Sequence, residues 1–383
     1  QYGLDGFGQT PMQQLRTTWN LICLRRPKVI FISSNSFLYL LTPHIKRRFP
    51  ETAIIDILHN EFDSIVDWFT ISSEYDQYLD RRIVTSQYWK DVLVEKYEID
   101  SSTVVVADNP VDTDLYDPGR FDSNEVLDGL GLDATKRTVS FIGRLHPQKG
   151  LDVFLALAKE MSDRQDVQFL IAGDGEFRDD AVEADRRMRH VHFLGHFPTV
   201  ERVLAATDVL VCPSAYEGAP LIGLECAAMD TALIAADVVG FSEQIAEGGF
   251  GMTYQASLNI HDDARTIRSL LDDRFDELLE RARHGRRWVL GRHSLPVVGE
   301  QYRSVLGALI EERPPSRPVR RRSGRRLTLH VGLPKTGTTT IQQTLLANRK
   351  QLAADGVVYP LAGLKGPGQM RIATSELSDR QRA

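Results

Sequence analysis

Long apolar runs are absent from this chain of 383 residues. A membrane-spanning helix needs about 18 consecutive apolar residues, so the sequence predicts no such helix. It also shows no signal-peptide pattern at its start. Acidic residues outnumber basic ones, leaving a formal charge of −6, which argues against nucleic acid as a partner. We therefore expect a globular protein of two or three domains.

Cysteine is scarce as well, with only Cys23, Cys212 and Cys226 in the whole chain. The three are far apart and lack the spacing of a metal site. Cys212 and Cys226 lie in apolar runs, which favours buried thiols in a reducing compartment and hence a cytoplasmic location. The chain also begins at Gln1 rather than Met, and we expect its first domain to be truncated at the start.

Apolar runs that alternate with helical patterns fill most of the chain. Helical patterns are expected between the runs, and one is also expected around Ile83. This alternation predicts an α/β fold with parallel sheets, which bind ligands at the carboxyl ends of their strands. A polar segment at 117–136, which contains Pro118 and three glycines, predicts a domain boundary. The runs that predict buried strands are 28–32, 53–58, 104–106, 138–142, 167–172, 191–194, 209–212 and 232–236.

The most informative stretch is 209–229, which indicates a buried strand, a polar loop and a helix. Glu217 and Glu225 bracket the loop and the first helical turn, with seven residues between them. Gly218 allows the backbone to approach a ligand, and free N–H groups at a helix start favour an anion. This combination suits a nucleotide sugar, which carries phosphates and hydroxyls. The alternative is that both glutamates are solvated surface residues.

A second loop, 143–150, follows the strand at 138–142 and carries two cations, Arg144 and Lys149. Fixed cations stabilise the negative charge that develops on a diphosphate leaving group. Each could instead be an ordinary surface residue. The turn Gly173-Asp174-Gly175 ends another strand, and its glycines either let the backbone approach a nucleotide or serve the turn itself.

Together these motifs resemble the donor site of the retaining glycosyltransferases of the GT-B fold, family four in particular, the glycosyl transferases group 1. Glu217-Gly218-x-Pro-Leu, followed by Glu225, and Gly143-Arg144-Leu145-x-x-x-Lys149-Gly carry the resemblance. It implies two Rossmann-like doubly wound domains facing a cleft. It also implies that Arg144 and Lys149 hold the donor diphosphate, that Glu225 accepts from ribose hydroxyls, and that Glu217 is catalytic near the donor sugar. We expect these four side chains to share one site.

The same resemblance implies sugar transfer from a nucleoside diphosphate sugar to a glycan or lipid-linked acceptor, with retention and without a metal, in cell-surface polysaccharide synthesis. His59, at a strand end, matches a second catalytic position weakly, and a structural role is the alternative. Asp112-Thr113-Asp114 is not taken as a metal motif, because it falls within a turn, from Asn109 on, that resembles the family's domain junction. The further donor-binding residues are Gly143, Gly173, Gly175, Gly218, Ala219, Leu221 and Ile222.

The end of the chain differs in composition. From Arg313 to Arg326 it has seven arginines, three prolines and no acidic residue, which predicts an extended linker. The alternative is a basic patch that binds anionic lipid at the inner face of a membrane. A predicted strand at 327–331 and a loop from Gly332 then resemble the phosphosulfate-binding loop of sulfotransferases, which use 3′-phosphoadenosine 5′-phosphosulfate. The residues expected to bind the phosphosulfate are Lys335, Thr336, Gly337, Thr338 and Thr339.

The sequence thus predicts four parts: a truncated acceptor-side domain at 1–118, a donor-binding domain at 119–310, a linker at 311–326 and a partial, P-loop-like α/β sulfotransferase segment at 327–383. A glycosyltransferase is the first hypothesis. The alternatives are a bifunctional protein that also transfers sulfate, a sulfotransferase with the GT-B part as a scaffold, and a module that binds nucleotide sugars without turnover.

Overall fold

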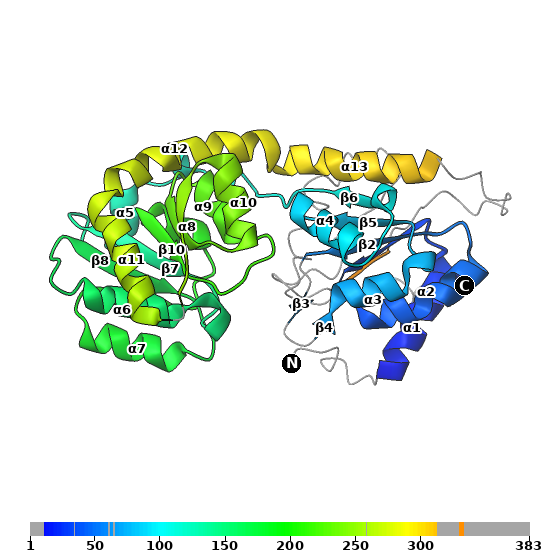
Figure 1. Cartoon of the computed structure of the whole chain (residues 1–383), viewed down its shortest axis with the longest axis horizontal. Coiled ribbons are helices and arrows are strands. Elements are labelled where there is room, and N and C mark those ends of the chain that lie inside the picture. The colour runs from blue at the N-terminus through cyan, green and yellow to red at the C-terminus, as the bar shows by residue number, and fades with distance from the viewer. Residues whose placement is uncertain are drawn as a thin grey trace, which may run out of the picture. The chain divides into compact units, whose positions relative to one another are not determined.

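The computed structural model describes residues 11–311 and 329–332, apart from residues 34, 60, 61, 64, 65 and 258. The chain divides into two compact units (Figure 1). Unit 1 takes the residues up to Pro110 and those from Leu295 on, and unit 2 is Val111–Ser294. Among the described residues, no helix is both long enough and apolar enough to cross a membrane.

Unit 2 is built on a six-stranded sheet in which every described pair of strands is parallel. Its spatial order is β12 (Gly251–Tyr254), β11 (Ala232–Ala236), β10 (Val209–Cys212), β7 (Arg137–Ile142), β8 (Val167–Ala172) and β9 (Val191–Gly195). From β7 the chain adds β8 and β9 toward one edge of the sheet, and from β10 it adds β11 and β12 toward the other edge. The strand order therefore reverses between β7 and β10, where sheets of this kind bind ligands beyond their carboxyl ends.

Helices cover both faces of this sheet because its strands are apolar on both sides. Val209 and Val211 of β10 face one core, and Leu210 and Cys212 face the other. The first core lies under α6 (Leu151–Glu160), α7 (Arg178–Arg187) and α11 (Ile260–Asp273). The second lies under α5 (Ser123–Gly129), α8 (Val200–Ala205), α9 (Leu221–Ala228) and α10 (Val239–Gly248). Helix α12 (Phe275–Arg292) contributes to both cores.

Unit 1 has a five-stranded parallel sheet in the order β13 (Leu329–Gly332), β1 (Val29–Ser33), β2 (Ala53–Leu58), β5 (Arg81–Val84) and β6 (Val104–Val106). Its helices are α1 (Pro11–Arg25), α2 (Ser36–Arg48), α3 (Trp68–Glu74), α4 (Gln87–Glu95) and α13 (Leu295–Glu311). Strand β3 (Phe62–Asp63) pairs antiparallel with β4 (Val66–Asp67). The α/β alternation expected from the sequence is thus confirmed in both units.

The boundaries of the two compact units differ from the domain boundaries expected from the sequence, and helix α13 shows why. Leu309 is buried, and it packs with Val305 and Leu306 against the face of the unit 1 sheet that carries Ile55 and Ile57. The helix therefore belongs to unit 1, although it lies within the range expected for the donor-binding domain. The chain passes between units at Pro110–Val111 and Ser294–Leu295, and these points lie side by side, since the Val111 amide donates to the His293 carbonyl at 2.7 Å.

Two local expectations also need correction. The helix expected around Ile83 is wrong, because Arg81–Val84 forms strand β5 between β2 and β6. Its β-branched Ile83 and Val84 pack on opposite faces of the sheet, which suits a strand better than a helix. The strand expected at 327–331 is found as Leu329–Gly332, but it extends the unit 1 sheet beside β1 rather than starting a sheet of its own.

Candidate functional site

The loops that follow β7 and β10 meet at the point where the strand order of unit 2 reverses. The Ala215 amide donates to the Gln148 carbonyl at 2.8 Å, and the Gln148 side chain donates to the Tyr216 carbonyl at 3.0 Å. Gly150 has a φ of 72°, and a Cβ there would lie 2.2 Å from the Pro213 carbonyl oxygen. Only glycine allows this close approach, so the sequence of the first loop brings its cations onto the second.

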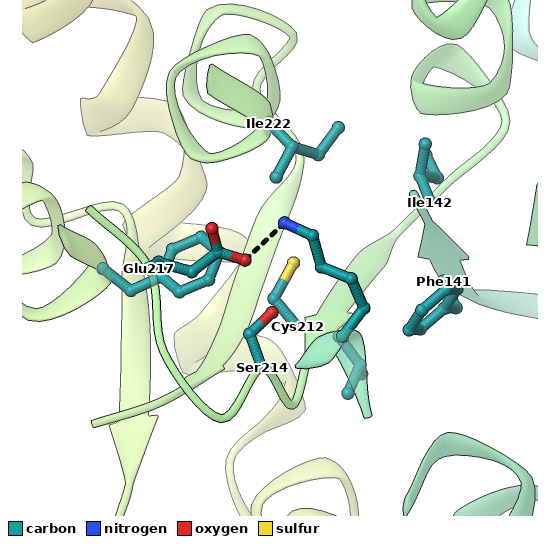
Figure 2. Close-up of a pocket in the computed structure, with 9 residues that line it drawn as sticks. Phe141, Ile142, Cys212, Ser214, Glu217 and Ile222 are labelled. Carbon is teal, nitrogen blue, oxygen red and sulfur yellow. Dashed lines mark hydrogen bonds and ion pairs between the residues drawn. The ribbon is translucent and has the colours of Figure 1, made fainter. Parts of the chain in front are cut away.

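The ion pair between Lys149 and Glu217 is the central contact between these loops. Lys149 Nζ lies 2.5 Å from Glu217 Oε1, and the two side chains are 25% and 9% exposed. Both line a pocket whose apolar walls include Phe141 and Ile222, as Figure 2 shows. Because the glutamate is almost buried, its charge depends on the lysine for compensation.

The space left free inside the pocket is small, about that of one water molecule. Sites for whole drug-sized ligands occupy roughly 300–1,000 Å³, so the pocket by itself does not accommodate a whole nucleotide sugar. Its polar groups are the ion pair and the side chains of Cys212 and Ser214 (Figure 2). Such a pocket can bind an anion through Lys149 and hydroxyl groups through Glu217.

Cys212 lies at this pocket as a buried thiol, as its apolar sequence context predicts. Burial raises the pKa of the thiol, the negative charge of Glu217 raises it further, and Lys149 partly opposes this. The thiol is therefore neutral at physiological pH and acts as a small, weakly polar side chain. Cys226 is also buried and forms no disulfide.

Arg144 does not line the pocket. Its side chain is exposed, and its Nη2 donates to Gln148 Oε1 at 3.2 Å. Gln148 in turn donates to the loop that carries Glu217, through the Tyr216 carbonyl. This bridging glutamine was not among the residues expected from the sequence, although it lies between the two cations in one short loop.

Glu225 lies on α9, and its neighbours differ from those of Glu217. The Tyr116 hydroxyl lies near the Glu225 side chain, and Glu201 of α8 adds a negative charge nearby. Removal from water raises the pKa of Glu225, the Tyr116 hydroxyl lowers it and Glu201 raises it further, for a net value of about 7. Like Arg144, Glu225 does not line the pocket, so the structure brings only two of the four expected side chains together there.

The start of α9 holds the backbone groups expected to bind the donor. Within the described residues, the helix has no side-chain cap, which leaves the N–H groups of its first turn, at Leu221 and Ile222, for a ligand or water. The Pro220 carbonyl accepts from Gln244 of α10 at 3.0 Å, which fixes the entry to the helix. Gly218 and Ala219 lie in the loop directly before it.

The glycines of the Gly173-Asp174-Gly175 turn support loop packing. A Cβ at Gly173 would lie 1.8 Å from the Gly143 carbonyl oxygen, and one at Gly175 would lie 2.3 Å from that of Leu145. The Leu145 amide donates to the Asp174 carbonyl at 2.9 Å. The structural interpretation thus explains these glycines, and it places the turn beside the loop that carries Arg144 and Lys149.

The other expected residues lie elsewhere. His59 follows β2 in unit 1, where its Nε2 lies 3.5 Å from Ser33 Oγ at the end of β1. Asp112 stabilises a turn, because its carboxylate accepts from the amides of Asp114 and Leu115 at 3.2 and 3.1 Å. The expected phosphosulfate-binding residues, 335–339, lie outside the described residues, as does the linker from 312 on.

Known proteins share sequence with this chain. Residues 136–273 match the family model "Glycosyl transferases group 1". A D-inositol 3-phosphate glycosyltransferase of Mycolicibacterium smegmatis is 30% identical over 267 residues, which cover 66% of this chain and 59% of the relative. An alpha-maltose-1-phosphate synthase of the same organism is 32% identical over 188 residues, 46% of this chain and 48% of the relative. The chain thus spans about half of each relative.

Solved structures share the fold at low sequence identity. HepE of Anabaena, in complex with UDP, superposes with a TM-score of 0.66 at 17% identity, over 78% of this chain and 84% of that one. Sucrose-phosphate synthase of Thermosynechococcus elongatus superposes with a TM-score of 0.64 at 17% identity, over 77% and 78% of the two chains. Residues 136–273 are therefore similar to the glycosyl transferases group 1, and the chain has an α/β fold of parallel sheets like that of the GT-B glycosyltransferases.

Proposed function

We propose that this chain transfers a sugar from a nucleoside diphosphate sugar, with unit 2 as the donor-binding part. The observation that carries the proposal is the Lys149–Glu217 pair, which lies in a pocket at the reversal of strand order. A cation and a carboxylate at that place match the two chemical parts of the donor. Lys149 would bind phosphate oxygens, and Glu217 would accept from sugar hydroxyls.

The resting ion pair also suggests how the donor enters. An arriving diphosphate competes with Glu217 for the ammonium group of Lys149, and the freed carboxylate can then accept from the sugar hydroxyls. The uncapped first turn of α9 adds N–H groups for the anion. Both groups of the pair thus exchange a contact with each other for contacts with the ligand. The similarity of residues 136–273 to the glycosyl transferases group 1 and a UDP-bound structure of the same fold support this assignment.

A screen of nucleoside diphosphates by thermal unfolding tests this proposal. We expect one of the uridine, guanosine, adenosine or cytidine diphosphates to raise the Tm, because a ligand that binds only the folded state stabilises it by about 2.7 kcal/mol at 100 times its Kd. The nucleoside monophosphate is the matched control, and it should stabilise less because it lacks the second phosphate. If millimolar concentrations of all four leave the Tm unchanged, the proposal fails.

The finer features of the reaction are part of the same proposal. We infer retention of configuration, no requirement for a metal, and a glycan or lipid-linked acceptor in cell-surface polysaccharide synthesis, from the resemblance of the sequence motifs. Lys149 and Arg144 would then supply the positive charge that a metal provides elsewhere. His59, the second expected catalytic residue, belongs to unit 1 and stays a prediction.

A chelator experiment tests the absence of a metal requirement. We expect transfer of labelled sugar to be unchanged in excess EDTA, because the diphosphate is neutralised by protein cations. The anomeric configuration of the product, read by proton NMR, should equal that of the donor. Loss of transfer in EDTA with recovery on adding magnesium would contradict metal independence, and an inverted product would contradict retention.

The remaining alternatives stay predictions from the sequence alone. Sulfate transfer from 3′-phosphoadenosine 5′-phosphosulfate by the tail depends on residues 335–339, which the structure does not describe. Two more interpretations are likewise predictions from the sequence. They are the binding of the basic segment 313–326 to an anionic membrane and a cytoplasmic location at the inner face of that membrane. A labelled-sulfate assay with the whole protein and a vesicle-binding assay would test them.

A further inference from the structure

The loop between β7 and α6 contains one turn of 3₁₀ helix, Pro147–Lys149, which is fixed at both ends. His146 caps its start, because the His146 Nδ1 accepts from the Gln148 amide at 3.2 Å. Gly150 ends the turn in the left-handed conformation. Successive side chains of a 3₁₀ helix point about 120° apart, so Gln148 and Lys149 leave the turn in different directions.

Gln148 joins this turn to the loop that carries Glu217. Its backbone carbonyl accepts from the Ala215 amide at 2.8 Å, and its side-chain Nε2 donates to the Tyr216 carbonyl at 3.0 Å. Lys149 instead lines the pocket, where it pairs with Glu217 (Figure 2). The main chain and the side chain of one glutamine thus bind two successive residues of the facing loop, which fixes the orientation of its amide.

The oxygen of the same amide holds Arg144, whose Nη2 donates to Gln148 Oε1 at 3.2 Å. The two ends of the amide cannot be exchanged, because a backbone carbonyl only accepts and a guanidinium only donates. Among the residues that the structure describes, Gln148 is the only side chain to which Arg144 is hydrogen-bonded. Two hydrogen bonds therefore connect this arginine to Tyr216, the residue directly before Glu217.

The partner of Arg144 is neutral, so the arginine keeps its full charge for a ligand. Asp174, whose carbonyl accepts from the Leu145 amide, lies in the neighbouring turn. Its carboxylate accepts from the Gly175 amide at 3.0 Å and from Arg178 at 3.3 Å. The glutamine amide orients the guanidinium without neutralising it, and an oriented, uncompensated guanidinium suits the binding of a phosphate.

We propose that Gln148 is a positioning residue of the donor site, which holds Arg144 ready to bind the donor diphosphate as a second cation beside Lys149. This inference rests on the proposed function, which places the diphosphate at Lys149. The pocket does not accommodate a whole nucleotide sugar, so the donor needs partners outside it, and Arg144 does not line the pocket. A guanidinium that is fixed before the ligand arrives loses less conformational freedom on binding.

A double-mutant cycle between Arg144→Ala and Gln148→Met tests the inference. Methionine has about the length of glutamine and makes neither hydrogen bond. The ligand is the one of the uridine, guanosine, adenosine and cytidine diphosphates that raises the wild-type Tm most, and calorimetry measures its Kd. Gln148→Met should weaken binding about fivefold, the effect of losing one typical hydrogen bond. In the Arg144→Ala background the same change should weaken binding by less than about twofold, because the glutamine acts through the arginine.

Gln148→Glu provides a second, independent measurement. Its carboxylate keeps the shape of the side chain and still accepts from Arg144, but it neutralises the guanidinium. The nucleoside diphosphate should therefore bind more weakly to Gln148→Glu than to Gln148→Met. Equal or tighter binding would show that the charge of Arg144 does not serve the ligand, and the inference would be overturned.

Gln87→Met changes an exposed glutamine of α4 in unit 1, and this matched control should leave Kd unchanged. If Gln148→Met causes equal losses in the two backgrounds, the glutamine only joins the loops, and the inference is overturned while the proposed function stands. An unchanged Kd in Gln148→Met has the same consequence. If the wild type binds none of the four diphosphates, the proposed function fails, and the role of Gln148 fails with it.

Discussion

Replacing Lys149 with alanine should lower kcat/KM for sugar transfer by about 100- to 1,000-fold, the usual effect of losing one donor that stabilises developing negative charge. The substitution removes the cation that the pocket offers to the diphosphate. It also leaves Glu217, only 9% exposed, as an unpaired negative charge that repels the ligand. Initial rates with the nucleotide sugar and calorimetry with the nucleoside diphosphate measure the two effects.

Two further variants make this prediction specific. Glu217→Gln removes the resting partner of Lys149, so it should bind the nucleoside diphosphate at least as tightly as the wild type while transferring sugar more slowly. Lys159→Ala changes an exposed lysine of α6 and should leave both quantities unchanged. If Lys149→Ala retains wild-type rates and affinity, the pocket at the strand reversal is not the donor site.

Replacing Glu225 with glutamine should make the protein more stable at pH 8 and poorer at binding a ribonucleotide. The pKa of Glu225 is raised from 4.5 to about 7 in the folded protein. The folded state therefore binds this proton more tightly than the unfolded state, and stability from this group falls as pH rises from 4.5 to 7. Above pH 7 the loss reaches about 3 kcal/mol at most, and glutamine, which carries no charge, avoids it.

Thermal unfolding at several pH values checks this sign. The Tm difference between Glu225→Gln and the wild type should be small near pH 4.5 and grow to its full value by pH 8. Glutamine has nearly the same shape as glutamic acid, so the packing is kept. Glu176→Gln, at an exposed position, is the control and should show no such trend. A variant that is less stable than the wild type at pH 8 would contradict the assigned cause.

Such a gain in stability would also fit a functional role. A carboxylate that is removed from water beside another acid destabilises the folded state. This suggests that the residue serves binding rather than packing. The same trade is absent at Lys149, where the charge is paired and the expected loss is one of activity. We therefore expect Glu225→Gln to raise stability while it lowers nucleotide binding. Lys149→Ala should lower activity without a gain in stability.

The elements around the site follow closely from local pattern. The run Val209–Cys212 is apolar throughout because both of its faces are buried, and the helix from Leu221 begins directly after Pro220. The arginine-containing strand Arg81–Val84 could not be recognised so easily. Arg82 is completely buried and compensated by Ser72 of α3 and by Asp76 in the turn that follows α3.

The sequence by itself determined the alternation of strands and helices and the loops that carry Arg144, Lys149, Glu217 and Glu225, because these depend on residues close together in the chain. Only the tertiary structure decided which of them meet. Lys149 and Glu217 lie 68 positions apart and are joined because β7 and β10 are neighbours in the sheet. Glu225 instead lies near Tyr116, whose backbone carbonyl accepts from Arg286. Strand order and helix packing are long-range properties, so no local pattern could reveal these partners.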